Sequence, residues 1–498
     1  MRCEQAWASV ECEYGIQEDP LSVQLVIPLS KGEPLFRQVY GGLRLAILAG
    51  RFRAGDRLPS TRDLAEQLGI SRTVVVIAYE QLLAEGFVLG RSGSGTYVPA
   101  GLSAARSAGP GKPAPLRLSR FGSFAAATGR TVEFPEPRAT SVRFDFAYGR
   151  SDVECFPFER WRRILHRRAR QARIRELDYG PAAGSDALRE AICVHLRRSR
   201  AVACDPSQVI VVSGSQQALD LIARVLIEPG DGIVIEDPSY QGTREVLRAA
   251  GARLHAIAVD RDGLDPASLP ETARMAFVTP SHQFPTGAIL PLARRQVLLR
   301  WAKRRNAVIV EDDYDGEFRY QAKPLESLQG LDTEGRVIYV GTFSRTIFSA
   351  LRIGYLIVPK SLLAAFTAAK WLCDRHTPTL EQETLAEFIS TGLYERHLRR
   401  VRRRNAAIRH ALLEALHQHM GDRVEVTGDG AGAHIVLWPR KRLSEEAAVA
   451  AAASRGVGIY GVTRYFLKRP SRPGILLGYP RLRETEIREG VRRLAEIL

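Results

Sequence analysis

A turn between an apolar run and a helical pattern could bind a phosphate group. Gly214, Ser215 and Gln216 follow the apolar residues 209–212 and begin a helical pattern that continues to residue 226. At such a turn the free backbone N–H groups and the helix dipole both favour an anion. A Ser-Gly-Ser turn alone is a weak signal, so a phosphate site depends on the residues around it.

Three successive acids end another apolar run. Glu311, Asp312 and Asp313 follow residues 307–310, which have the composition of a buried strand. Burying carboxylates is costly unless each one has a partner, so this pattern favours a functional site over a structural one. Either Asp312 or Asp313 could be the functional carboxylate.

The elements that must position these side chains alternate along the second half of the chain. Apolar, strand-like runs alternate with helical patterns such as 215–226 and 292–305, which is typical of a mostly parallel sheet covered by helices. Two short strand-like runs, 424–426 and 434–437, and a closing helical pattern over 484–498 predict a smaller C-terminal α+β part.

The N-terminal residues predict a different kind of unit. Residues 35–48 have helical spacing, a second helix is expected from Ser60 to Leu68, and Ser71 could cap a third that runs to about Glu85. The short turn between the last two helices is what a helix-turn-helix requires, and the β segments 87–89 and 96–98 predict a wing. A three-helix packing unit without a ligand is the alternative.

Length and composition limit the function classes. At about 150 residues per domain, 498 residues suggest about three folding units and exclude a single small binding module. The net charge of +16 favours an acidic or polyanionic partner. Six cysteines without a C-x-x-C pair predict neither a zinc site nor a disulfide framework, and no metal is expected. Without an export signal or a long apolar run, a reduced, cytoplasmic protein is expected.

We therefore divide the chain into four parts. Residues 1–30 form an N-terminal lead, which we expect to be disordered, and residues 31–98 form the winged helix-turn-helix. Residues 99–143 are rich in Ala, Gly, Ser, Pro and Arg and are interpreted as a flexible linker. Residues 144–498 form the large α/β domain.

The N-terminal unit resembles the GntR-type winged helix-turn-helix along "GDRLPSTRDLAEQLGISRTVVVIAYEQLLAEGFVLGRSGSGTYV". The resemblance implies DNA binding. N-terminal residues of the third helix would reach base edges in the major groove, while the preceding helix start and the wing suit the backbone and minor groove. The candidate DNA contacts are Arg57, Ser60, Thr61, Arg62, Ser71, Arg72, Thr73, Arg91 and Gly95.

The region from residue 144 onward resembles fold-type I aminotransferases, and with the N-terminal unit the chain resembles the MocR/GabR regulators. The resemblance implies a pyridoxal 5'-phosphate (PLP) site, with Tyr240 of "EDPSY" stacked on the ring and Asp312 and Tyr314 of "IVEDDYDGEF" on the pyridine nitrogen and ring hydroxyl. In "SHQFPTG", Phe284 occupies the position of a family asparagine, whose polar contact His282 or Gln283 could replace. The implied phosphate and ring contacts are Gly214, Ser215, Gln216, Tyr240, Asp312, Tyr314, Thr342, Ser344, Arg352 and Tyr179.

The segment "GTFSRTIFSALRIGY" departs from the family pattern at one position. Arg345 stands where the family has the lysine that forms a Schiff base with PLP. A guanidinium is neither a nucleophilic amine nor a base at cellular pH, so no catalytic residue is assigned. PLP, or a PLP–amine adduct, is expected to bind non-covalently. The alternative is an empty or repurposed pocket.

Two further features concern the effector and the partner. The family's substrate-carboxylate arginine is replaced near Ile475 and Leu476, and any of Arg464, Arg472 or Arg481 could lie nearby. Tyr179 of "LDYGPAAG" resembles the tyrosine that reaches a neighbouring subunit's phosphate, which implies a homodimer with shared sites. The basic runs 160–175 and 396–404 are interpreted as solvated helix faces, with extra DNA contact as the alternative.

The combined prediction is an α/β protein that regulates transcription. A winged helix-turn-helix binds double-stranded DNA, and an aminotransferase-like domain forms the dimer and senses PLP or a small effector. One alternative is an active PLP-dependent aminotransferase with an appended DNA-binding domain. The other is a regulator whose large domain is a scaffold that does not bind PLP.

Overall fold

The computed structural model describes residues 27–30, 32–100, 116–131, 142–173, 178–320, 326–441, 443–468 and 470–498. The chain divides into two compact units, Met1–Arg117 and Leu118–Leu498. Most of the predicted N-terminal lead, and residues 101–115 and 132–141 of the predicted linker, lie outside the described residues. Among the described residues, no helix is long and apolar enough to cross a membrane.

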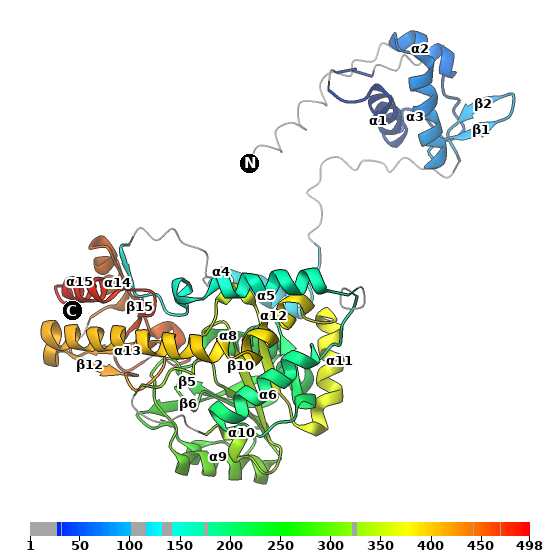
Figure 1. Cartoon of the computed structure of the whole chain (residues 1–498). Coiled ribbons are helices and arrows are strands. Elements are labelled where there is room, and N and C mark those ends of the chain that lie inside the picture. The colour runs from blue at the N-terminus through cyan, green and yellow to red at the C-terminus, as the bar shows by residue number, and fades with distance from the viewer. Residues whose placement is uncertain are drawn as a thin grey trace. The chain divides into compact units, whose positions relative to one another are not determined.

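The described residues of the first unit form three helices and a two-stranded hairpin, labelled in Figure 1: α1 (Leu35–Leu48), α2 (Thr61–Leu68), α3 (Arg72–Ala84), β1 (Leu89–Arg91) and β2 (Gly95–Tyr97). The hydroxyl of Ser60 accepts a hydrogen bond from the Asp63 N–H and so caps α2, and Gly69 ends that helix in the left-handed region. Val39, Leu64 and Val75, one from each helix, are fully buried in a common core. The predicted helices and wing are therefore present.

The two strands lie closer to the turn of the hairpin than the predicted β segments 87–89 and 96–98. Leu89 pairs with Tyr97 and Arg91 with Gly95 in an antiparallel ladder. Val88 and Val98, which the sequence placed in the strands, are buried just outside this ladder in the core of the unit. Val88 before β1 and Val98 after β2 thus anchor the base of the hairpin, and Arg91 is exposed at the other end of β1, next to the turn.

In the second unit the described residues form an eight-stranded sheet in the order β4-β11-β10-β9-β8-β5-β6-β7. The five central strands are parallel, while β11 and β7 run antiparallel to their neighbours. This confirms the predicted mostly parallel sheet. The strands are β4 (Val209–Val212), β5 (Gly232–Asp237), β6 (Arg253–Asp260), β7 (Gly263–Leu264), β8 (Met275–Val278), β9 (Val308–Asp312), β10 (Val337–Thr342) and β11 (Gly354–Ile357).

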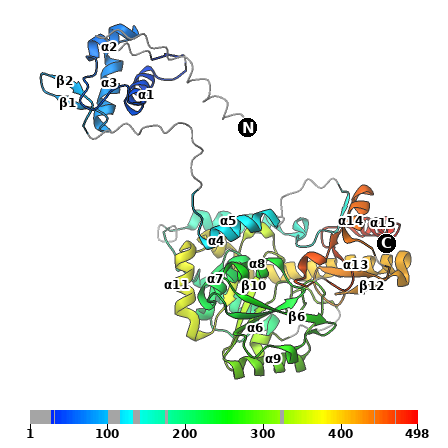
Figure 2. The same cartoon turned by 180° about the vertical axis from the view of Figure 1, so that it is seen from behind.

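Helices cover this sheet, as Figures 1 and 2 show from opposite sides. They are α4 (Arg120–Thr131), α5 (Phe158–Gln171), α6 (Asp186–Arg200), α7 (Ser215–Leu226), α8 (Gln241–Ala249), α9 (Leu292–Arg305), α10 (Leu328–Leu331), α11 (Leu363–Asp374) and α12 (Thr379–Ser390). Helix α4 lies within the stretch that the sequence assigned to the linker and neighbours α8.

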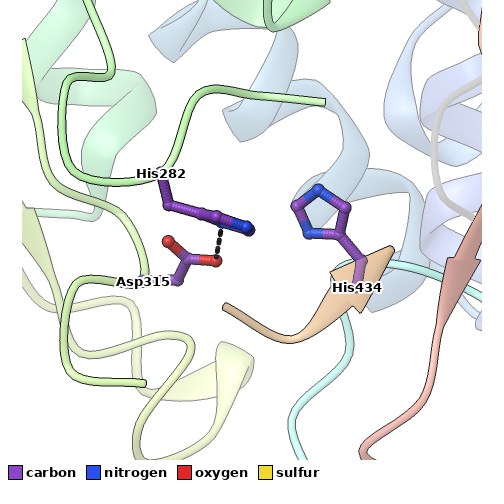
Figure 3. A group of neighbouring side chains, drawn as sticks. All are labelled: His282, Asp315 and His434. Carbon is purple, nitrogen blue, oxygen red and sulfur yellow. Dashed lines mark hydrogen bonds and ion pairs between the residues drawn. The ribbon is translucent and has the colours of Figure 1, made fainter. Parts of the chain in front are cut away.

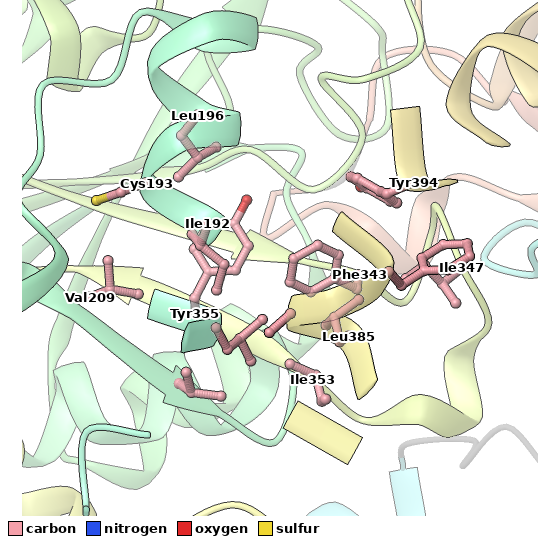
Figure 4. Packing of buried hydrophobic residues seen from close by; sticks show 14 of the residues in the cluster. Ile192, Cys193, Leu196, Val209, Phe343, Ile347, Ile353, Tyr355, Leu385 and Tyr394 are labelled. Atoms are coloured by element: carbon pink, nitrogen blue, oxygen red, sulfur yellow. The ribbon is translucent and has the colours of Figure 1, made fainter. Parts of the chain in front are cut away.

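The sheet has an apolar core on each face because successive strand residues point to opposite sides. Val209 and Val211 of β4 pack into a core with residues of α6 and α12, part of which Figure 4 shows. Ile210 and Val212, the residues between and after them, pack into a second core with α7. Burial on both faces explains why the strands are continuous apolar runs rather than alternating ones.

A long helix connects the sheet to the smaller C-terminal part. Helix α13 (Leu393–Met420) places Leu398 in the core around α6 and α12 and Leu412 in the C-terminal core. That part has a four-stranded sheet, β12-β13-β16-β15, and a short β3·β14 pair. Its elements are β3 (Phe144–Asp145), β12 (Val424–Thr427), β13 (His434–Pro439), α14 (Glu445–Ser454), β14 (Val457–Gly458), β15 (Tyr460–Gly461), β16 (Ile475–Gly478) and α15 (Glu484–Leu494).

Candidate functional site

The turn before α7 brings the start of a helix close to Arg352. Gly214 has a φ of +85°, which favours glycine, and a Cβ there would lie 2.6 Å from Nη2 of Arg352. Arg352 donates from Nη2 to the Ser213 carbonyl at 2.9 Å. The first N–H groups of α7 and a guanidinium therefore lie together, as a phosphate requires.

The register of the sheet places Thr342 at the same end of the strands as the turn before α7, and Ser344 follows two residues later. Thr342 pairs with Gly354, which in turn pairs with Val212 immediately before the turn. Thr342 Oγ1 accepts from the Ser344 N–H at 3.2 Å. Ser344 Oγ is buried and has no hydrogen-bond partner among the described residues. It is free to donate to a bound phosphate.

The three acids that end β9 have different partners. Glu311 is fully buried and accepts from the N–H groups of Leu328 and Gln329, each at 2.9 Å, at the start of α10. Asp313 Oδ2 accepts from Nε of the buried Arg200 at 2.7 Å and from the Tyr339 hydroxyl at 2.5 Å. These two acids serve the fold.

Asp312 has no hydrogen-bond or ion-pair partner among the described residues, and its Oδ1 is buried. Burial raises the pKa of Asp312 to about 7; Asp313 adds to the rise and Arg345 opposes it. A protonated pyridine nitrogen would supply both a donor and a charge to this carboxylate. Of the two aspartates that could be the functional carboxylate, Asp313 already has partners, and Asp312 has none among the described residues.

Aromatic side chains surround the space between the turn before α7 and Asp312. Tyr240 caps α8, is 39% exposed, and meets the buried Phe284 edge to face with ring centroids 6.1 Å apart. Tyr314 meets the same Phe284 at 6.0 Å. Gln216 donates from Nε2 to the Gly242 carbonyl at 3.5 Å, two residues beyond Tyr240. The predicted ring and phosphate residues are thus close together.

Tyr314 is held by a buried cluster that sequence reasoning did not assemble. The Tyr314 hydroxyl lies 3.1 Å from His282 Nδ1, which is also 3.0 Å from Asp315 Oδ2. His434 faces this pair (Figure 3); its Nε2 lies 2.9 Å from the Pro285 carbonyl, and its Nδ1 has no partner among the described residues. One potential metal-ligating atom from each of His282, Asp315 and His434 lies within 4.8 Å of the others.

The two residues that could replace the family asparagine have different contacts. Gln283 donates from Nε2 to the Pro238 and Phe284 carbonyls, each at 2.7 Å, so its amide N–H groups already have partners. His282 instead contacts Tyr314. Asp315 follows the acid run at once and could have been noticed in the sequence, whereas His434 comes from β13 and is brought in by tertiary structure alone.

Arg345 lies beside these aromatic rings. Its guanidinium carbon is 4.6 Å from the centroid of the Tyr148 ring, a cation–π contact. Burial lowers the pKa of Arg345, but neighbouring groups led by Tyr148 and Asp315 outweigh burial and raise it. Arg345 is therefore charged, close to Tyr240 and Tyr314, and cannot act as an amine.

The wall where the family has a carboxylate-binding arginine is apolar. Ile475 and Leu476 are fully buried in β16, and Leu476 packs in one cluster with Phe284 and Trp438. Arg472 is half-exposed and pairs with Glu425 at 2.6 Å, and Arg481 is exposed. Arg464 lies over the ring of Tyr465 at 5.9 Å.

Tyr179 lies away from the other predicted cofactor residues. Its side chain is 72% exposed and is covered on one side by the guanidinium of Arg375, 4.6 Å from the ring centroid. An exposed tyrosine can contact a second subunit, which is the role that the sequence predicted. That role stays a prediction.

In the N-terminal unit the predicted DNA contacts gather at two places. The first is the turn between α2 and α3, where Arg72 donates from Nε to Thr61 Oγ1 at 3.3 Å. Ser71 occupies the N-cap position of α3, but its side chain makes no capping hydrogen bond. The second is the wing, where a Cβ on Gly95 would lie 2.7 Å from Nε of Arg57. Apart from the partly buried Thr61 and Gly95, the predicted contacts are exposed: Arg57, Ser60, Arg62, Ser71, Arg72, Thr73 and Arg91.

Comparisons with known proteins agree with both units. Residues 35–98 match the family of bacterial regulatory proteins of the gntR type, and residues 148–494 match aminotransferase class I and II. The chain is 39% identical to the probable rhizopine catabolism regulatory protein MocR of Rhizobium meliloti, over 94% of this chain and 95% of that protein. It is 35% identical to the transcriptional regulator TauR of Rhodobacter capsulatus, over 91% and 94%.

A solved structure shares the fold of the large unit. It is LysN, the α-aminoadipate aminotransferase of Thermus thermophilus, complexed with N-(5'-phosphopyridoxyl)-L-leucine. The TM-score is 0.69 and the identity 30%, over 76% of this chain and 98% of the other.

Proposed function

The chain belongs to the MocR-type transcriptional regulators, which join a GntR-type helix-turn-helix to an aminotransferase domain, and from this we propose how its two units work. The N-terminal unit binds double-stranded DNA. The start of α3 enters the major groove, and the wing contacts the backbone and minor groove. The exposed, basic contacts from Arg57 to Arg91 support this proposal, and such a regulator acts in the cytoplasm, where its DNA lies.

The large unit binds PLP without a covalent bond. The observation that carries this proposal is Asp312, a buried carboxylate with no partner among the described residues. The unpartnered Ser344 Oγ and the Gly214 turn with Arg352 fit a phosphate at the other end of the site. The residues present therefore fit PLP.

When bound, PLP would supply an electron-withdrawing ring and an aldehyde that reacts with amines. The chain's own residues would bind and orient that ring. Asp312 would hold a proton at the pyridine nitrogen, Tyr240 would cover one face, and Tyr314, fixed by His282, would donate to the ring hydroxyl. Arg345 supplies no amine, so the cofactor stays exchangeable.

Two subunits share the sites in this proposal. The exposed Tyr179 would reach the phosphate of the partner's site, as the family resemblance implies. A dimer carries two DNA-binding units, which suits a DNA site with two parts. A ligand that binds one arrangement of these units more tightly would shift the equilibrium between arrangements and so regulate transcription.

The relatives favour a regulator over an active aminotransferase with a DNA-binding appendage. An enzyme would need another lysine to replace the missing one. Lys370 is fully buried, but its Nζ is paired with Asp374 Oδ1 at 2.5 Å, which also accepts, through Oδ2, from Gln217. An amine held in an ion pair with a carboxylate is a poor nucleophile, which argues against Lys370 as the replacement.

Two measurements test the proposal. The full chain is titrated with PLP and followed by absorbance, then reduced with borohydride and weighed by mass spectrometry. We expect a saturable spectral change without covalent mass gain; no saturable change would support a scaffold that does not bind PLP. Fluorescence anisotropy with the DNA upstream of its own gene should give a specific, salt-sensitive complex, and its absence would contradict regulation of that gene.

A further inference from the structure

Arg345 is partly buried and has no anionic partner among the described residues. The described residues offer it the Tyr148 ring and no hydrogen-bond or ion-pair partner. The nearby carboxylate of Asp315 is already bonded to His282. The five N–H donors of this charged guanidinium have no acceptor among the described residues, so the position is suited to a ligand that supplies acceptors.

The backbone around Arg345 is shaped to admit the guanidinium. Gly149 has a φ of +94°, and a Cβ there would lie 2.9 Å from Nη1 of Arg345. The same relation holds at the phosphate end, where a Cβ on Gly214 would lie 2.6 Å from Nη2 of Arg352. At Gly149 and at Gly214, the absence of a side chain lets the guanidinium of an arginine lie close to the backbone.

Two aromatic rings connect Arg345 to the apolar residues near the position of the family's carboxylate-binding arginine. Tyr148 contacts Phe284 with ring centroids 4.9 Å apart, and Phe284 packs in one cluster with Leu476. Arg345 also lines a small cavity together with Tyr148, Gly149, Ser151, Asp152 and Asn405. Ser151 Oγ in this cavity is buried and has no partner among the described residues, so it too could donate to an anion.

We propose that Arg345 is the receptor for a carboxylate of the effector, so that one residue both removes the lysine chemistry and replaces the missing carboxylate clamp. This proposal rests on the proposed function, because it places the carboxylate beside a bound phosphopyridoxyl ring. The ligand class is a carboxylate-bearing amine carried on that ring. A planar guanidinium fork matches a carboxylate with two parallel hydrogen bonds, which a lysine could not provide.

A matched pair of ligands isolates the carboxylate. The first is N-(5'-phosphopyridoxyl)-L-leucine, and the second is N-(5'-phosphopyridoxyl)-3-methylbutylamine, which lacks only the carboxylate. Both are reduced adducts, so neither can react with a lysine. Their dissociation constants are measured by calorimetry on the full chain, together with that of PLP.

We expect the wild-type chain to bind the leucine adduct about 10- to 100-fold more tightly than the amine adduct, the range for a charge-assisted pair. Arg345→Gln should abolish this preference and leave the affinity for the amine adduct within about threefold, since only the carboxylate contact is lost. Arg345→Lys keeps the charge without the fork and should retain part of the preference. The distant Arg488→Gln, which removes one positive charge from α15, is the control.

The outcomes separate this inference from the proposed function. Equal binding of the two adducts by the wild-type chain, or a preference that survives in Arg345→Gln, would overturn the role of Arg345 while PLP binding stands. Failure of PLP and both adducts to bind would overturn the proposed function itself. Should Arg345→Gln not fold, as judged by circular dichroism, the wild-type preference and Arg345→Lys still decide the question.

Discussion

Arg200 Nε lies 2.7 Å from Asp313 Oδ2, and this buried ion pair determines the role of the neighbouring acid. Because Arg200 and Tyr339 occupy Asp313, the carboxylate that faces the candidate site without a partner is Asp312. Asp312 is the last residue of β9 and Asp313 is the first residue after it, and their side chains have different surroundings. Four predictions concern this site, and a fifth concerns the N-terminal unit.

Asp312→Asn should flatten the pH dependence of stability. The pKa of Asp312 is about 7 in the folded chain, against an ordinary value near 4. Between these values the folded state keeps a proton that the unfolded state has released, so stability falls as pH rises, by at most about 1.4 kcal/mol per pH unit. Urea denaturation at pH 5, 6 and 7 measures the slope.

Glu334→Gln, at an exposed acid paired with Lys303, should leave the slope unchanged. Burial raises the pKa values of Glu236 and Glu311 to about 7, so both groups also make stability fall as pH rises. Asp312→Asn should therefore reduce the slope of stability against pH without removing it. A variant with the full wild-type slope would contradict the assignment of Asp312.

Arg352→Gln should weaken the binding of PLP by about 10- to 100-fold, because a charge-assisted contact to the phosphate is lost. Pyridoxal, which lacks the phosphate, should bind wild type and variant alike. Absorbance titrations with both compounds measure the effect. An equal loss for both would mean that Arg352 acts on the fold of the turn through Ser213 rather than on the phosphate.

Arg345→Lys should restore covalent capture of PLP. The new amine would stand beside Tyr148, at the position that the resemblance gives to the family's Schiff-base lysine, within reach of the aldehyde of bound PLP. After borohydride reduction, the mass of the variant should rise by one phosphopyridoxyl group at residue 345. The wild-type chain treated in parallel is the control, and a covalent group on another lysine in both proteins would reopen catalysis.

Arg72→Gln should weaken specific DNA binding by about 1–3 kcal/mol. Arg72 is exposed at the start of α3 and lies next to Thr61, and the proposed function places this helix start in the major groove. Anisotropy titrations with specific and scrambled DNA separate base recognition from backbone contact. Arg37→Gln, on the exposed side of α1, should change neither affinity, and a uniform loss in Arg72→Gln would reassign that residue to a phosphate.

Tyr179→Phe should weaken the binding of PLP by about 2- to 10-fold, the effect of one lost hydrogen bond. The exposed hydroxyl is proposed to reach the partner's phosphate, while the ring against Arg375 is retained in the variant. Sedimentation velocity should show an unchanged dimer. A wild-type chain that stays monomeric at the concentrations used would contradict the shared site.

Local patterns in the sequence were enough to predict much of the fold. Helix boundaries such as Leu35–Leu48 and Ser215–Leu226 were predicted to the residue, since apolar spacing and caps are local signals. Helix α4, in the stretch assigned to the linker, was not predicted, because its composition of Ala, Gly and Ser shows no sustained period.

The sequence by itself determined the family, the type of each unit and the replacement of the lysine by Arg345, because these depend on residue identity and spacing along the chain. The tertiary structure decided which acid is left without a partner, that His434 from β13 joins His282 and Asp315, and that Leu476 makes the opposite wall apolar. These relations join segments more than a hundred residues apart, and sheet register and packing set them. The spacing of residues along the chain therefore does not predict these contacts.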